Sequence, residues 1–330
     1  MPLATFLDRY GGPDVIVSYT APLRDAWARM RRLLFSPFHL EAWLVVGLSA
    51  FLAGLSGGAL LGGGGNWKLG GHTPDARAAN EALDKALGVL ANPLWLGLIA
   101  LGLIAFAILY AVLLWVSARA HFVFLENVAS GHAGFREPWR RSAALGRSLF
   151  LFWAALSFAW LVPIAFALVA ILPIVREWYF TNRLVMPAPA MLFACGAGAV
   201  ASAIAIGLVG LLTHDFVVPL MWRHGEGATA AWARFGPLLA ARAGDFVAWV
   251  LFAMLVTIVA VVGIALAGLA TLCIGFLLLA IPYVGTVLLL PLLVTARGFG
   301  PAFLAQFGPE WNVFPARADD ESGVSAPPAD

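Results

Sequence analysis

A serine in a glycine-rich setting is the first feature of this chain that could do chemistry. Residues 54–58 read Gly-Leu-Ser-Gly-Gly, which matches the GxSxG pattern of serine hydrolases and the GxSG pattern of intramembrane serine proteases. In both classes a neighbouring base must activate the hydroxyl group. All six histidines fall outside the expected membrane helices, and only His72 is expected on the same side as Ser56. We therefore interpret this run as tight glycine packing rather than as a nucleophile.

Histidines and carboxylates offer a second chemistry, metal binding. Two related segments each hold two histidines and a carboxylate that could converge on one ion, namely His121, His132 and Glu126, and His214, His224 and Asp215. Neither segment has the tight ligand spacing of a metal motif, and no HExxH occurs. The sequence therefore predicts no catalytic residue, no cofactor site and no metal site, and we expect the protein not to be an enzyme.

Arginines give the most consistent pattern. Ahead of the first apolar run, apolar side chains recur at helical spacing: Leu23, Trp27, Met30 and Leu34. Arginines cover the other side, which is typical of a basic amphipathic helix lying at a membrane surface. Each arginine near an anionic leaflet contributes about 1 kcal/mol, although such arginines can also serve only as topological anchors. The candidate contacts for lipid headgroups or a partner are Arg24, Arg29, Arg31, Arg32, Arg136, Arg140, Arg141 and Arg234.

The elements that position these residues are expected to be membrane helices. Hydrophobic residues make up 62% of the chain and charged residues 12%, against roughly 25% charged in soluble domains. Six segments reach the length of about 20 apolar residues that a crossing needs: 40–60, 94–116, 149–174, 190–212, 246–268 and 272–296. The first ends in a glycine run, and Pro282 and Gly285 interrupt the last, so either could be kinked or re-entrant. The sequence predicts an all-α, polytopic helix bundle with about six transmembrane helices.

Charge distribution predicts the orientation of these helices. A cytoplasmic amino terminus places fifteen of the 20 lysines and arginines inside, so both termini are expected in the cytoplasm. We expect a cytoplasmic tail over 1–20, a membrane domain over 21–312 and a disordered tail over 313–330. Residues 1–38 show no cleavable signal peptide, and Cys195 and Cys273 could pair in one disulfide.

The basic segments also suggest an internal repeat. Three stretches share a leading tryptophan, basic residues and a second tryptophan at the expected membrane boundary, with spacings of 16, 14 and 17: AWARMRRLLFSPFHLEAW, PWRRSAALGRSLFLFW and AWARFGPLLAARAGDFVAW. We interpret them as three pseudo-repeats, each a basic amphipathic interfacial helix followed by a helical hairpin. In the fourth crossing, Ala199, Ala203 and Gly207 predict close helix packing.

Four further segments carry a resemblance to a known family: FSPFHLEAW, FVFLENVASGHAGFREPWRR, DFVVPLMW and IPYVGTVLLLPLLVTARGF. They resemble uncharacterised bacterial membrane proteins that are often labelled glycerophosphoryl diester phosphodiesterase membrane domains. The resemblance spans most of 20–312 and implies a six-helix bundle of the bacterial inner membrane, without the catalytic domain and without cofactors.

The function that we expect is therefore a non-enzymatic scaffold or accessory protein. Its partners would be anionic lipids of the cytoplasmic leaflet or a cytoplasmic protein, and not nucleic acid. A permease or lipid transporter with a path between the repeats is the alternative, and a membrane enzyme is a third possibility.

Overall fold

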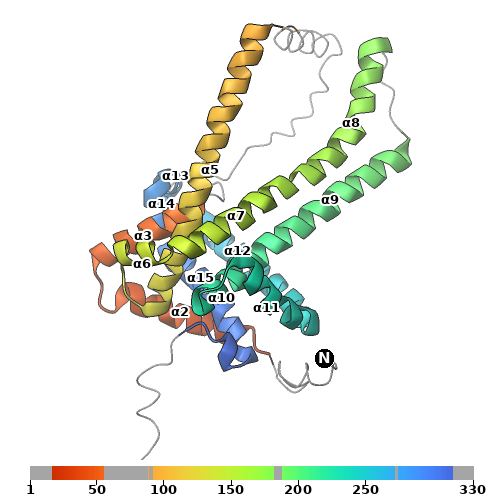
Figure 1. Ribbon diagram of the computed structural model, residues 1–330. Coiled ribbons are helices and arrows are strands. Elements are labelled where there is room, and N and C mark those ends of the chain that lie inside the picture. Colours follow the sequence, from red (N-terminus) through yellow and green to blue (C-terminus); the bar gives the residue numbers. More distant parts are fainter. Residues whose placement is uncertain (1–16, 56–87, 89–91, 182–187, 272–273, 315–330) are drawn as a thin grey trace, which may run out of the picture. The chain divides into compact units, whose positions relative to one another are not determined.

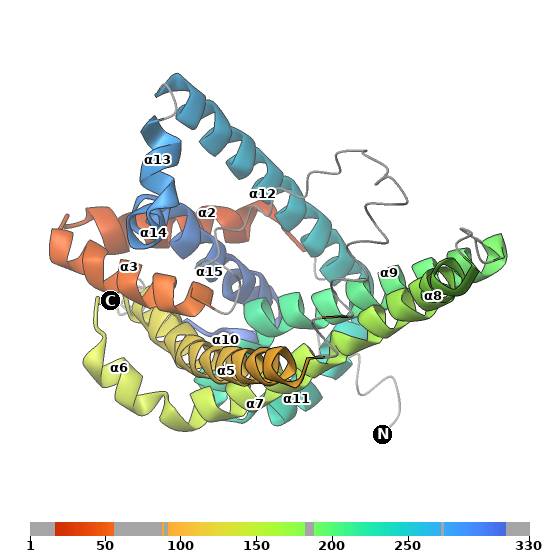
Figure 2. The same cartoon turned by 90° about the horizontal axis from the view of Figure 1, so that it is seen from above.

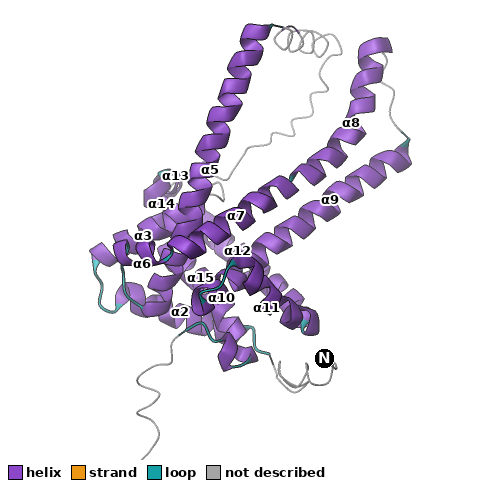
Figure 3. Ribbon diagram, viewed as in Figure 1, coloured by secondary structure: helices purple, strands orange, loops and turns teal. Residues whose placement is uncertain are grey.

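The computed structural model describes residues 17–55, 88, 92–181, 188–271 and 274–314, with side chains of 175–181 left out. Every regular element within these ranges is helical (Figure 3). The chain divides into two compact units. Unit 1 comprises Met1–Leu60, Val116–Phe150 and Leu212–Asp330, and unit 2 comprises Leu61–Trp115 and Leu151–Leu211.

Figure 1 shows the helices in chain order. Their bounds are α2 Thr20–Phe35, α3 Leu40–Gly54, α5 Pro93–Ser130, α6 Arg136–Arg141, α7 Ala143–Ala159, α8 Leu161–Thr181, α9 Pro189–Leu212, the π-helix η3 Thr213–Val217, α10 Val218–His224, α11 Ala228–Ala241, α12 Ala243–Ala270, α13 Ile274–Ala280, α14 Pro282–Leu288, α15 Leu290–Leu304, and the 3-10 turns η4 Ala305–Phe307 and η5 Pro309–Trp311.

Four of the six expected crossings lie in continuous helical stretches long and apolar enough to span a membrane. These stretches are Pro93–Ser130, Ala143–Ile174, Pro189–His224 and Ala243–Ala270. They contain the predicted segments 94–116, 149–174, 190–212 and 246–268. Several long apolar helices indicate a multi-pass membrane protein.

The other two expected crossings are not seen as continuous helices. α3 has 15 residues, which gives it a length of about 22 Å against a hydrocarbon layer of about 30 Å, and residues 56–60 lie outside the described residues. Segment 272–296 is divided into α13, α14 and α15, and α14 is bent by 66° from the helix that follows it. Pro282 and Pro291, which have no N–H group to donate, lie at the starts of α14 and α15. If that bent pair counts as one crossing, the total among the described residues is five.

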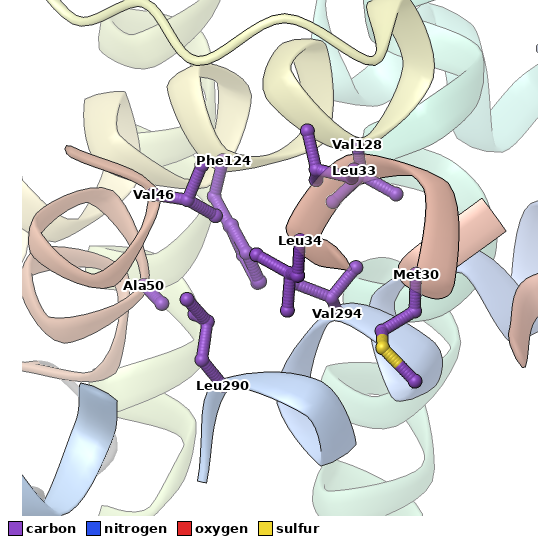
Figure 4. Close-up of a cluster of buried hydrophobic side chains, with 9 residues drawn as sticks. All are labelled: Met30, Leu33, Leu34, Val46, Ala50, Phe124, Val128, Leu290 and Val294. Atoms are coloured by element: carbon purple, nitrogen blue, oxygen red, sulfur yellow. The ribbon is translucent and has the colours of Figure 1, made fainter. Parts of the chain in front are cut away.

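The core of unit 1 forms where α2, α3, α5 and α15 meet. Met30, Leu33 and Leu34 of α2 pack with residues of the other three helices in one buried cluster (Figure 4). α2 lies along α15, where a Cβ added to Gly298 would be 3.4 Å from the Cβ of Ala26. Each fully buried aliphatic side chain contributes about 1.5–3 kcal/mol, so this contact holds α2 firmly.

The buried face of α2 differs from the predicted one. Pro22, Ala26, Met30 and Leu34 are buried, whereas Trp27 is 46% exposed. The small Ala26 faces α15 because helices approach closely where side chains are small, and the bulky Trp27 is turned outward. The apolar face of this helix is therefore covered by protein rather than left for a membrane surface.

An aromatic cluster completes unit 1 around η3, α11, α12 and α15. The ring of Phe216 lies 4.6 Å from that of Trp249 and 5.4 Å from that of Phe235, measured between centroids. Trp249, which was expected at the membrane boundary, is only 1% exposed. Figure 2 shows α12 leading into α13 and α14, with α14 lying against α3.

Unit 2 contains the first part of α5, the end of α7, α8 and most of α9. The hydroxyl groups of Tyr110 and Ser157 are 2.9 Å apart. On α9, a Cβ at Gly198 would meet the Phe166 ring at 2.9 Å, so this glycine makes the close contact, while Gly207 has no atom of this kind within 4 Å. Cys195 is buried on α9, and Cys273 lies outside the described residues.

Candidate functional site

A break in the helix from Pro189 to His224 leaves the backbone carbonyl of His214 without a donor from its own helix. At η3 the N–H group of Val218 donates to the carbonyl of Thr213, five residues earlier. The residue five positions after His214 is Pro219, which has no N–H group. The carbonyl of His214 must therefore find its donor elsewhere, because an unpaired buried carbonyl is costly.

Arg297 of α15 supplies that donor. Its Nη1 donates to the carbonyl oxygen of His214 at 2.8 Å, and its Nη2 donates to that of His121 at 3.2 Å. Arg297 is only 3% exposed. One guanidinium thus joins three segments that are far apart in sequence, namely the second half of α5, η3 and α15.

The remaining members of this group surround the guanidinium. The rings of His121 and His214 are edge to face with centroids 5.0 Å apart, and Nδ1 of His214 donates to Oδ1 of Asp215 at 2.7 Å. The carboxylate of Asp215 also interacts electrostatically with Arg297. We call these four residues the Arg297 cluster.

Gly300 brings the same two segments together one turn later. A Cβ at this position would lie 2.4 Å from the carbonyl oxygen of Asp215, well inside van der Waals contact. That carbonyl is four residues before Pro219, so it too lacks an α-helical donor. α15 therefore approaches the broken helix closely for two reasons. Arg297 donates a hydrogen bond to it, and Gly300 has no side chain to keep the two backbones apart.

The Arg297 cluster holds helices together through hydrogen bonds from a charged guanidinium. His121 and His214 do come together, as the metal hypothesis required, but a guanidinium with a permanent positive charge lies between their backbones. His132 is exposed and contacts the carbonyl of Ser130. Within the described ranges, no three His, Cys, Asp or Glu side chains are grouped as metal ligands.

In the sequence, Arg297 is only one of the fifteen basic residues expected in the cytoplasm. Pro219 in a helical stretch indicates that the carbonyl four residues earlier, that of Asp215, lacks its α-helical donor. The corresponding need at His214 follows from the π-helix, which the sequence does not reveal. The two glycines at 298 and 300, directly after the arginine and around Phe299, also indicate a closely packed helix.

A second polar site lies where α5, α6, α7 and α10 meet. Nη2 of Arg141 is 3.0 Å from Oε1 of Glu126, and its Nε is 3.6 Å from Oε1 of Glu137. Beside this pair is a cavity of about 180 Å³, lined by Glu126, Arg141, Ser142, Leu145 and Trp222. Glu126 of α5 and Glu137 of α6 are thus both paired with the same arginine.

The eight predicted arginines all lie in unit 1, on α2, α6 and α11. Arg24, Arg31 and Arg32 of α2 and Arg136 and Arg140 of α6 are exposed, and none of the five forms an ion pair with another described residue.

The other predicted arginines have partners. The guanidinium of Arg29 lies 3.6 Å from the centre of the Phe314 ring. Arg141 pairs with Glu126, as described above. Arg234 of α11 donates from both Nε and Nη2 to Glu226, and this hydrogen bonding holds the pKa of the Glu226 carboxyl below its ordinary value.

The fold defines an all-helical protein with four or five helices able to cross a membrane. The chain belongs to a family of unknown function, DUF7544, whose family model matches residues 18–309. The expectation of an uncharacterised family is confirmed, but nothing links the chain to the glycerophosphoryl diester phosphodiesterase membrane domain. No curated protein and no solved structure matches the chain significantly.

Proposed function

We propose that this protein is a non-enzymatic, multi-pass scaffold or accessory protein of the bacterial inner membrane, and that exposed arginines on α2 and α6 bind anionic lipid headgroups. The observation that carries the proposal is the set of five exposed arginines on these helices that have no carboxylate partner among the described residues. An arginine whose charge is not neutralised within the protein is free to pair with phosphate.

Packing of α2 supports this role because it fixes where the arginines point. One face of α2 is buried against α15, and Nε1 of Trp43 donates to the carbonyl of Leu34 at the end of the helix. Little backbone entropy is then lost when a lipid binds. Trp27 and Phe35, which are 46% and 48% exposed, lie on the same helix and suit the headgroup zone.

Only two of the three predicted basic helices are part of this proposal. α2, α6 and α11 are each followed by an apolar helix after a break, at residues 36–39, Ser142 and Arg242. α11 differs from the other two because its Arg234 is neutralised by Glu226. We therefore place the lipid-binding surface on α2 and α6, and both termini in the cytoplasm. A reporter fused after Asp330 that is active only outside the cytoplasm would overturn the orientation.

The test compares glutamine and lysine variants of α2 in lipid nanodiscs. The full-length protein would be reconstituted in phosphatidylcholine with and without phosphatidylglycerol, and retained lipid would be measured by native mass spectrometry. At about 1 kcal/mol for each arginine, Arg24→Gln, Arg31→Gln and Arg32→Gln together lower phosphatidylglycerol retention by about a hundredfold. The matched triple lysine variant keeps the charge and most of the binding. Equal retention by the glutamine variant and the wild type would refute the proposal.

A lipid transporter or permease is the second candidate, and the Arg297 cluster favours it. Ionisable groups buried on membrane helices often mark a transport path. The test is the movement of a fluorescent phospholipid between leaflets of proteoliposomes. Transfer that is present in the wild type and lost in His214→Ala would favour transport, and its absence in both would favour the scaffold.

A further inference from the structure

We propose that the cavity beside Glu126 binds a phosphoethanolamine group, with the ammonium on Glu126 and Trp222 and the phosphate on Arg141. This inference deepens the proposed function, because it rests on lipid contact and names a headgroup at a separate site. The cavity has a volume of about 180 Å³ and is lined by Glu126, Arg141, Ser142, Leu145 and Trp222, so it holds both signs of charge within one small space.

The first argument is the local charge. Arg141 is the one guanidinium placed between two carboxylates in this site, at 3.0 Å from Glu126 and 3.6 Å from Glu137. The side chain of Glu126 is only 14% exposed, whereas that of Arg141 is 62% exposed. A partly buried carboxylate whose cationic partner faces solvent can accept hydrogen bonds from a second cation.

The second argument is the aromatic wall. Trp222 reaches the cavity from α10, and an indole ring is the strongest aromatic partner for an ammonium group. A primary ammonium can donate hydrogen bonds to Glu126, which a trimethylated choline cannot. The indole ring can accept either ammonium group, and the hydrogen bond to Glu126 selects ethanolamine over choline.

The third argument is the phosphate side of the site. Arg141 ends α6, where Arg140 is its neighbour and is also exposed. When an ammonium neutralises Glu126, the Arg141 guanidinium becomes available to the adjoining phosphate. A zwitterionic ligand thus replaces the ion pair of Arg141 with Glu126 by two ion pairs, one between the ammonium and Glu126 and one between the phosphate and Arg141. The total charge of the site is unchanged.

The fourth argument is depth relative to the apolar helices. Glu126 is ten residues beyond the apolar segment 94–116, Trp222 is ten residues beyond 190–212, and Ser142 is seven residues before 149–174. At a rise of 1.5 Å per residue, these separations are on the order of 10–15 Å along the helices. All three elements therefore place the cavity just outside the hydrocarbon layer, within reach of headgroups.

The experiment uses the full-length protein in nanodiscs that contain equal amounts of phosphatidylethanolamine and phosphatidylcholine. Native mass spectrometry measures which lipid stays bound. The wild type is expected to retain phosphatidylethanolamine about tenfold more than phosphatidylcholine, and Glu126→Gln is expected to lose this preference. A wild type without the preference, or a Glu126→Gln variant that keeps it, overturns the proposal.

Two further variants guard against misfolding. Trp222→Leu should weaken the preference without removing a charge, and Glu226→Gln, which neutralises a carboxylate outside the cavity, should leave it unchanged. If both Glu126→Gln and Trp222→Leu are folded and keep the preference, the site is refuted. The triple glutamine variant of α2 should lose phosphatidylglycerol but keep phosphatidylethanolamine, so failures of the two proposals are distinguishable.

Free phosphoethanolamine tests where the ligand comes from. If the free compound raises the melting temperature of the wild type in lipid-free detergent, but not that of Glu126→Gln, then a soluble source is sufficient. If only the phospholipid binds, then the acyl chains are required and the ligand is a membrane lipid. Binding of neither compound overturns the assignment.

Discussion

Replacement of Gly300 by alanine tests the contact between α15 and the broken helix. The new Cβ would lie 2.4 Å from the carbonyl oxygen of Asp215 and 3.1 Å from its carbonyl carbon. Because the atoms it meets are backbone, the strain cannot be relieved by a side-chain rotation. Overpacking of this kind costs about 1–3 kcal/mol or more, while alanine in a helix returns at most about 1 kcal/mol. We expect a net loss of stability of about 1–2 kcal/mol.

The measurement is the thermal unfolding of the purified protein in detergent, followed by tryptophan fluorescence. A loss of about 1–2 kcal/mol corresponds to a fall in Tm of about 2–8 °C in a domain of this size. Gly236→Ala in α11 is the matched control, because nothing lies within 4 Å of the added Cβ, and it should leave Tm unchanged or raise it. If Gly300→Ala behaves like this control, the close approach of α15 to Asp215 is wrong.

Three other predictions concern polar groups of unit 1. Arg297→Met should destabilise the protein by about 3–5 kcal/mol in the same assay, because it leaves the carbonyl oxygens of His214 and His121 without their donor and Asp215 without the nearby positive charge. Asn127→Ala should cost about 1–3 kcal/mol, since the Asn127 side chain is buried and accepts from the N–H group of Gly134 at 3.1 Å. The pair of Glu226 and Arg234 should stabilise at neutral pH and lose this effect in acid. Arg234 lowers the pKa of Glu226, so the pair contributes to stability at pH values above the ordinary carboxyl pKa. This contribution disappears as the pH falls through the lowered pKa. The difference in Tm between the wild type and Glu226→Gln should therefore vanish at that pH.

Hydropathy was sufficient to predict the helices whose apolar run is uninterrupted. Segments 94–116 and 246–268 each lie within one long helix, because an apolar stretch without proline satisfies its own backbone in lipid. Segment 272–296 is equally apolar, but its two prolines end one helix and begin another. Average hydropathy does not register where the N–H groups are missing, and this is why the sixth expected crossing is not one continuous helix.

The candidate site was less predictable because it depends on contacts between distant residues. Periodicity predicted the helix α2 correctly, but its buried face is centred on Ala26 and not on Trp27. Which of the two is buried depends on the contact with Gly298, more than 270 positions away in the sequence. Glu126, considered as a metal ligand from sequence, pairs with Arg141 instead. The role of Arg297 required knowing which carbonyl on another helix had lost its donor.

The hydrogen bond from Arg297 to the carbonyl of His214 can form only after α15 has been synthesised, so unit 1 is completed late. His121 and His214 leave the ribosome long before Arg297, so the broken helix must keep its free carbonyl hydrated until α15 is made. α2 also lacks its packing partner until then, because it packs along α15. A chain stalled before residue 290 therefore exposes both an apolar face and an unpaired carbonyl. These are the features that membrane chaperones and proteases detect, which makes α15 the segment whose arrival separates an unfinished chain from a finished one.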